Sequence, residues 1–74
     1  MKMILEERAA AAAGLTEGDK KALDFIVANK KSACFLSSYD IAARIGTSPS
    51  TVVRLSKKLG YGSFAAFRRA LQAE

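Results

Sequence analysis

Apolar residues recur at intervals of three and four along most of the chain, and no stretch alternates apolar and polar residues long enough to predict a strand. Residues 2–13 consist mainly of alanine and other strong helix formers, and Gly14 follows them as a predicted helix end. A second helix is predicted over residues 16–29, because Thr16 and Asp19 form a capping-box-like start with aspartate in place of glutamate. The buried stripe of this helix is expected to contain Leu23, Ile26 and Val27.

The middle of the chain contains a short apolar run and then a second capping-box-like start. The run, residues 33–36, predicts one helical turn tucked under the core, with Cys34 as a small buried side chain. The sequence Ser37-Ser38-Tyr39-Asp40 then predicts the start of a helix that stops at Gly46.

The last third of the chain predicts two more helices. Ser48 is a preferred N-cap residue and Pro49 suits the first helical position, so a helix is expected to run from there to Gly60. After a short link, the final helix is expected to start near Phe64 and to pack Phe67 and Leu71 inward. Together these patterns predict a compact all-α domain of five helices covering residues 1–74, with an N-terminal helix in 1–14, a helix-turn-helix in 38–59 and a C-terminal helix in 63–74.

The segment 38–59 has the pattern of two helices joined by a tight turn. Ala42 falls where the helices are expected to cross, and a larger side chain there would push them apart. Gly46 ends the first helix at a position that needs a positive φ, which glycine adopts at low cost. The expected interior of the motif consists of Ile41, Ala42, Ile45, Gly46, Val52, Leu55 and Leu59.

The charge of the chain is concentrated in this half. The net charge is +5, and residues 38–74 supply six basic and two acidic residues, or +4 of that total. A basic half on a small domain suggests a polyanionic partner. The second motif helix should expose hydroxyl groups at its leading end and cations behind them, which suits the major groove of duplex DNA. The side chains expected to lie off its buried face are Ser48, Ser50, Thr51, Arg54, Lys57 and Lys58.

Four other interpretations of this pattern compete with DNA binding. The basic face could simply be solvated, or the helices could hold a protein partner or form a dimer without touching DNA. The second helix argues against a protein partner, because Val53 is its only sizeable apolar side chain expected to be exposed. Double-stranded RNA has a major groove too narrow for a helix, and the chain offers no evident aromatic platform. An enzyme is not expected, because there is no histidine and Cys34 has no partner base.

Composition sets further limits. One cysteine makes no internal disulfide, and without histidine no zinc site is expected, so no metal and no cofactor are predicted. No apolar run approaches the ~18 residues of a membrane span, and the N-terminus lacks the apolar core of a signal peptide. These features predict a cytoplasmic location.

Residues 15–74 resemble the N-terminal helix-turn-helix domain of the RpiR family of bacterial transcriptional regulators. The resemblance rests on Leu15-Thr16-Glu17, Phe35-Leu36-Ser37, Thr51-Val52-Val53-Arg54, Lys57-Lys58-Leu59-Gly60-Tyr61 and Gly62-Ser63-Phe64. It implies a regulator of sugar-metabolism genes that is homodimeric at full length. It also implies a C-terminal sugar-isomerase-like domain that senses phosphorylated sugars. Nothing here matches that domain, so a fragment is expected. Lys30-Lys31-Ser32 departs from the family pattern, in which a Pro-acidic pair is common.

The expected DNA contacts divide into two groups. Arg54 and Ser50 are predicted to read base edges, because arginine to guanine is the commonest specific contact, and Pro49 is placed near a thymine methyl group. The backbone N–H groups at the start of the second helix add anion binding. The remaining predicted contacts, mainly to phosphates, are Tyr39, Thr47, Ser48, Thr51, Lys57 and Lys58.

Overall fold

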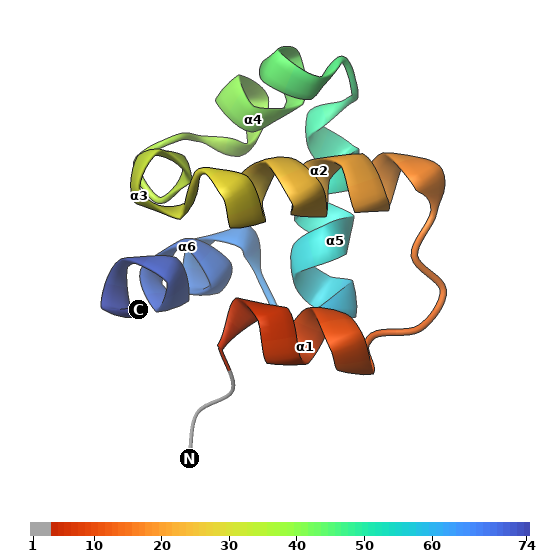
Figure 1. The fold of residues 1–74 in the computed structure, drawn as a ribbon. Helices are drawn as coiled ribbons and strands as arrows, with labels where there is room; N and C mark the ends of the chain where they lie inside the picture. Colours follow the sequence, from red (N-terminus) through yellow and green to blue (C-terminus); the bar gives the residue numbers. More distant parts are fainter. Residues whose placement is uncertain (1–3) are drawn as a thin grey trace.

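The computed structural model describes residues 4–74 and contains six helices within that range (Figure 1). The predicted all-α fold class is confirmed, with six helices rather than five, and the short helical turn expected at 33–36 forms at Lys30–Ala33 instead. Asn29, with φ −131° and ψ 37°, breaks the chain direction between the second and third helices. The helices are α1 (Leu5–Ala11), α2 (Glu17–Ala28), α3 (Lys30–Ala33), α4 (Ser38–Ile45), α5 (Pro49–Lys58) and α6 (Phe64–Ala73).

The first helix is shorter than its sequence predicts. Residues 2 and 3 lie outside the described range, and α1 ends at Ala11 because Ala12 adopts an extended conformation with ψ of 143°. The alanine-rich sequence favours helix, but the chain must leave this axis to reach α2. Leu5 is fully buried and anchors α1 to the core.

Both predicted capping boxes are present. The Thr16 hydroxyl accepts a hydrogen bond from the Asp19 amide at 3.1 Å, and the Asp19 carboxylate accepts one from the Thr16 amide at 2.9 Å. Ser37 and Asp40 make the equivalent pair at the start of α4, at 3.1 and 3.3 Å. These reciprocal bonds satisfy N–H groups that a helix start would otherwise leave without partners.

The apolar run at 33–36 is only partly buried. Ala33 and Cys34 are buried as expected, but Phe35 is 74% exposed, so its predicted place under the core is wrong. Phe35 lies beyond the end of α3 and its side chain faces solvent, whereas the neighbouring Cys34 is buried next to α6. There the Cys34 carbonyl accepts hydrogen bonds from Arg68 and Gln72.

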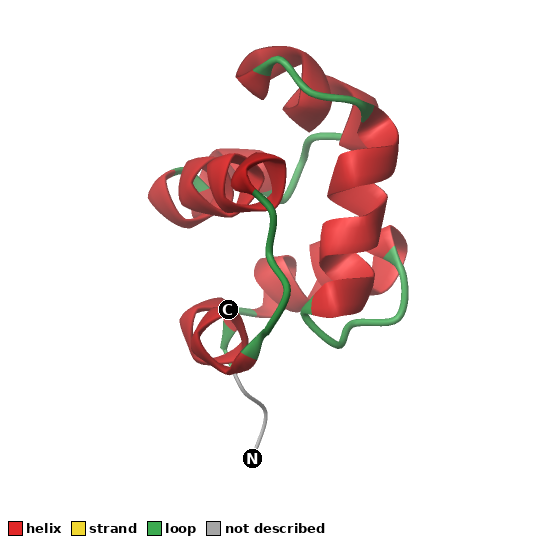
Figure 2. Ribbon diagram, turned by 90° about the vertical axis from the view of Figure 1, so that its right-hand side faces the viewer, coloured by secondary structure: helices red, strands yellow, loops and turns green. Residues whose placement is uncertain are grey.

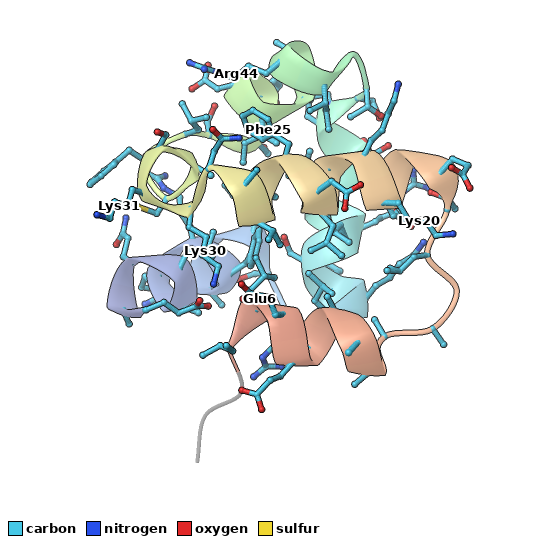
Figure 3. All side chains as sticks on the ribbon, in the orientation of Figure 1. Glu6, Lys20, Phe25, Lys30, Lys31 and Arg44 are labelled. Atoms are coloured by element: carbon cyan, nitrogen blue, oxygen red, sulfur yellow. The ribbon has the colours of Figure 1, made fainter. Side chains whose placement is uncertain are left out.

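The two ends of the fold meet through charges. Lys30 Nζ lies 2.6 Å from a carboxylate oxygen of Glu6 and 2.6 Å from one of Glu74, which links α1, α3 and the end of α6. Figure 3 shows Lys30 and Glu6 directed toward one another. Hydrogen bonding to the two carboxylates raises the pKa of Lys30. The Leu5 amide also donates to Glu74, at 3.0 Å.

The core lies between α2, α4, α5 and α6, with α1 closing one end. In the turned view, α5 stands along one side of the domain, while α2 lies across its inner side (Figure 2). Phe67 is fully buried, and its ring centroid lies 5.0 Å from that of Tyr61 in a tilted contact and 6.1 Å from that of Phe64 in an edge-to-face contact. This arrangement leaves the outer face of α5 uncovered.

Candidate nucleic-acid interface

The outer face of α5 follows from its helical register. Val52, Leu55, Ser56 and Leu59 are buried against the rest of the domain. Ser56 is the one polar residue on this face, and its hydroxyl donates to the Val52 carbonyl one turn earlier, at 3.1 Å. At 100° per residue, the side opposite this face carries Ser50, Arg54 and Lys57, and all three are exposed. We call these three residues the outer stripe of α5.

The turn between α4 and α5 fixes where the outer stripe points. Gly46 ends α4 in the left-handed region with φ of 71°, and the Thr47 amide donates to the Ala42 carbonyl at 3.0 Å. Ile41 and Ala42 are buried at the contact with α5, whereas Ile45 is half-buried. The short turn therefore sets α5 at a steep angle to α4, as Figure 1 shows.

The leading (N-terminal) end of α5 carries hydroxyl side chains but has no side-chain capping hydrogen bond. Ser48 is the N-cap and Pro49 the first helical residue, but the Ser48 side chain makes no capping hydrogen bond. Its hydroxyl instead lies 3.1 Å from the hydroxyl of Thr51. No acidic residue occupies the first turn, so the partial positive charge of the helix start is not neutralised locally.

Gly18 brings the start of α2 close to this leading end. A Cβ at position 18 would lie 3.6 Å from Thr51 Cγ2 and 3.8 Å from Thr47 Oγ1. These are ordinary van der Waals distances, so the start of α2 packs close to both threonines, which are half-buried. Thr47 and Thr51 are thus less available to a partner than Ser48 and Ser50, which are exposed.

The structure places the other predicted contacts as follows. Tyr39 lies in the first turn of α4 and is 73% exposed, and Pro49 is half-buried at the start of α5. Within residues 4–74, neither Arg54 nor Lys57 makes a side-chain hydrogen bond or an ion pair. Their charges therefore face solvent without a protein partner in the described part of the chain.

Lys58 differs from its neighbour Lys57. Its ammonium lies 2.6 Å from Asp19 Oδ2 and 3.3 Å from the Gly14 carbonyl oxygen. The Asp19 side chain is only 3% exposed. Burial alone would raise the pKa of Asp19, but hydrogen bonds from Lys58 and Thr16 outweigh it, and the pKa is lowered. The Lys58 charge is thus paired with Asp19 at the trailing end of α5.

Arg8 is a residue that sequence reasoning missed. One of its guanidinium N–H groups donates to the Leu59 carbonyl at 3.1 Å, and its Cζ lies 4.3 Å from the centre of the Tyr61 ring. A Cβ at position 60 would lie 2.8 Å from the same guanidinium and would displace it, while the φ of 88° is what favours glycine there. Burial raises the pKa of Tyr61. No local sequence pattern predicts a contact between residues that are 51 positions apart.

Across residues 4–74, no group of three or more cysteine, aspartate or glutamate side chains is arranged to hold a metal ion. None of the helices described there is long and apolar enough to cross a membrane.

Comparison with known proteins places this geometry in a family. A relative from Escherichia coli (strain K12), described as the uncharacterized HTH-type transcriptional regulator YfhH, is 41% identical over 58 residues, which are 78% of this chain and 21% of the relative. The chain therefore spans about a fifth of that relative's length. No solved structure matches the chain. The model of the rpiR-family helix-turn-helix domain matches residues 2–74, so the chain belongs to that family.

Proposed function

We propose that this domain binds duplex DNA in a sequence-specific manner, as the DNA-reading part of a bacterial transcriptional regulator, and that α5 enters the major groove. The observation that carries this proposal is the outer stripe of α5: Ser50, Arg54 and Lys57 are exposed on one side of a helix whose opposite side is buried. A major groove is wide enough to admit a helix, and its rims are lined with phosphates.

Two residues of the outer stripe are suited to read bases. Ser50 and Arg54 lie one turn apart, so both reach into the groove when the leading end of α5 enters it. The guanidinium of Arg54 can donate to O6 and N7 of a guanine together, and the Ser50 hydroxyl can donate or accept. Pro49, beside them, supplies an apolar surface for a thymine methyl group.

Other exposed groups of the motif are suited to hold phosphates. Lys57 supplies a cation on the outer stripe that has no partner within residues 4–74, Ser48 supplies an exposed hydroxyl at the start of α5, and Tyr39 supplies one in the first turn of α4. Thr47 and Thr51 remain in the proposed set at the edge of contact, because both are half-buried. Lys58 is left out of it, because Asp19 already holds its ammonium.

The competing proposal, a protein-interaction module that uses the same helix, fits the outer stripe less well. A partner groove for a helix needs apolar anchors. Val53 is half-buried, and the large exposed apolar side chains of the described residues are Ile4, Phe35 and Tyr39, none of them on α5. The face of α5 therefore favours a polyanion.

We extend the proposal to the protein that carries this domain. Its family membership supports a homodimer that reads two half-sites and a phosphosugar effector bound by a separate C-terminal domain, with sugar-metabolism genes as targets. In a two-fold dimer of this motif, the second helices enter successive major grooves ~34 Å apart. That spacing would be visible in the operator as an inverted repeat.

The proposal is tested by selecting bound sequences from a random duplex library with the 74-residue chain. We expect an enriched motif, and an inverted repeat if the chain pairs on DNA. Arg54→Ala should abolish the enrichment, while Arg69→Ala, which changes an exposed arginine on α6, should retain it. A library that emerges without any enriched sequence would contradict sequence-specific binding.

A further inference from the structure

Two adjacent lysines at the end of α5 have the same chemistry but different surroundings. Lys57 belongs to the outer stripe and has no protein partner among residues 4–74. Lys58 contacts Asp19 at 2.6 Å and the Gly14 carbonyl at 3.3 Å. On a helical wheel, Lys58 is only 40° from Arg54, so it would face the same groove if its ammonium were released.

Asp19 is nearly buried and is held in place by two hydrogen bonds to one of its oxygens. Its side chain is 3% exposed, and the same oxygen, Oδ2, accepts both the Thr16 amide at 2.9 Å and the Lys58 ammonium at 2.6 Å. The capping box that starts α2 is therefore also the anchor for the trailing end of α5. If Lys58 left, the nearly buried Asp19 carboxylate would be unpaired, which is costly. A DNA phosphate therefore competes poorly with Asp19 for the Lys58 ammonium.

We infer that Asp19 is a positioning residue that holds the trailing end of α5 and removes the charge of Lys58 from the DNA-binding surface. This inference rests on the proposed DNA binding and assigns different roles in it to Lys57 and Lys58. Lys57 contributes to the sequence-independent attraction for phosphates, and Lys58 does not. The domain thereby limits its affinity for unrelated DNA, while α5 keeps a fixed angle to α2.

The salt dependence of binding distinguishes the two lysines. The slope of log K against log salt changes by about 0.9 for each phosphate that a protein cation neutralises. On a duplex of unrelated sequence, Lys57→Met should make the slope shallower by about 0.9. Lys58→Met should leave the slope of a folded variant unchanged, although both substitutions remove one lysine from the same turn.

The reverse experiment releases Lys58. Asp19→Asn keeps an oxygen for the Thr16 amide but removes the negative charge, so the slope should become steeper by about 0.9 and affinity for unrelated DNA should rise. The double variant Asp19→Asn/Lys58→Met should return the slope to that of the parent. It also avoids an unpaired buried carboxylate, so it serves if Lys58→Met alone does not fold.

The outcomes separate this inference from the proposed function. If the parent does not bind duplex DNA at all, the proposed function fails. If the parent binds but Lys58→Met, or the double variant, flattens the slope as much as Lys57→Met does, Lys58 contacts phosphate and the inference is overturned. An Asp19→Asn variant that is folded by circular dichroism and keeps the parental slope would also overturn it.

Discussion

The leading and trailing ends of α5 differ in how the rest of the domain holds them. At the leading end, the Ser48 side chain makes no capping hydrogen bond, and Arg54, six residues further on, has no partner in the described chain. At the trailing end, Lys58 is held by Asp19, and the Leu59 carbonyl is held by Arg8. One end is left open and the other is fastened. A helix that must present side chains at a fixed angle to a partner is anchored through side chains that the partner does not use, and Lys58 and Arg8 do this while Lys57 in the same turn stays exposed.

The most damaging way to break this comparison is to remove the core that supports both ends. Leu55 is fully buried in the middle of α5, and Leu55→Ala should lower the free energy of unfolding by about 2–5 kcal/mol. Chemical denaturation measures the change. Val53→Ala, on the half-buried flank of the same helix, is the matched control and should cost clearly less. Equal losses would mean that α5 does not bury the face described above.

A smaller effect is expected at the turn that directs the leading end. Ala42 is 1% exposed where α4 meets α5, and Ala42→Leu should destabilise the domain by roughly 1–3 kcal/mol through overpacking. Ala43→Leu, at the exposed neighbouring position, should have little effect. Gly46→Val should also destabilise, because its φ of 71° is strained for a β-branched residue. Melting temperatures like that of the parent for Ala42→Leu and Gly46→Val would contradict the motif geometry.

The fastening at the trailing end can be tested through Arg8. Arg8→Met keeps most of the aliphatic chain but removes the hydrogen bond to the Leu59 carbonyl and the contact with the Tyr61 ring. We expect a loss of about 1–2 kcal/mol in the free energy of unfolding. Because Arg8 does not belong to the outer stripe, the salt slope of DNA binding should not change. A stable variant with a flattened slope would show instead that Arg8 acts on DNA.

The smallest effect on stability is expected at the leading end itself. Ser48→Ala should change the free energy of unfolding by no more than about 0.5 kcal/mol, since the Ser48 hydroxyl caps no backbone amide. Ser63→Ala is the control, because the Ser63 hydroxyl accepts from the Ala66 amide at 3.1 Å, and its loss should cost ~1 kcal/mol. Thermal denaturation of the two variants under identical conditions should rank them in this order, and the opposite ranking would contradict the open leading end.

The sequence predicts the helices well where local chemistry determines them. The Thr16–Asp19 and Ser37–Asp40 capping boxes, the proline after Ser48 and the positive φ of Gly46 are all readable from neighbouring residues. The sequence fails where a residue depends on distant parts of the chain. Phe35 lies in an apolar run, yet it follows the end of the short α3 and its side chain faces solvent.

Charged residues show the same limit. In the sequence Lys57 and Lys58 are equivalent, and only the packing of α2 against α5 gives one of them a buried carboxylate. Arg8 lies on an alanine-rich helix whose sequence gives no sign of a polar contact, and its partner is 51 residues away. The composition of a basic surface is therefore predictable from sequence, whereas the subset of cations left available to a ligand is a property of the tertiary structure.

The most direct test of the account is the base preference of Arg54. Binding is measured across all single-base variants of the selected site, for the parent and for Arg54→Lys, which keeps the charge but cannot form the bidentate contact with guanine. We expect the parent to discriminate by about 1–3 kcal/mol at one position per half-site, and Arg54→Lys to lose that preference while retaining its salt slope. An unchanged preference at every position would contradict base reading by Arg54 and move that role to Ser50 and Thr51.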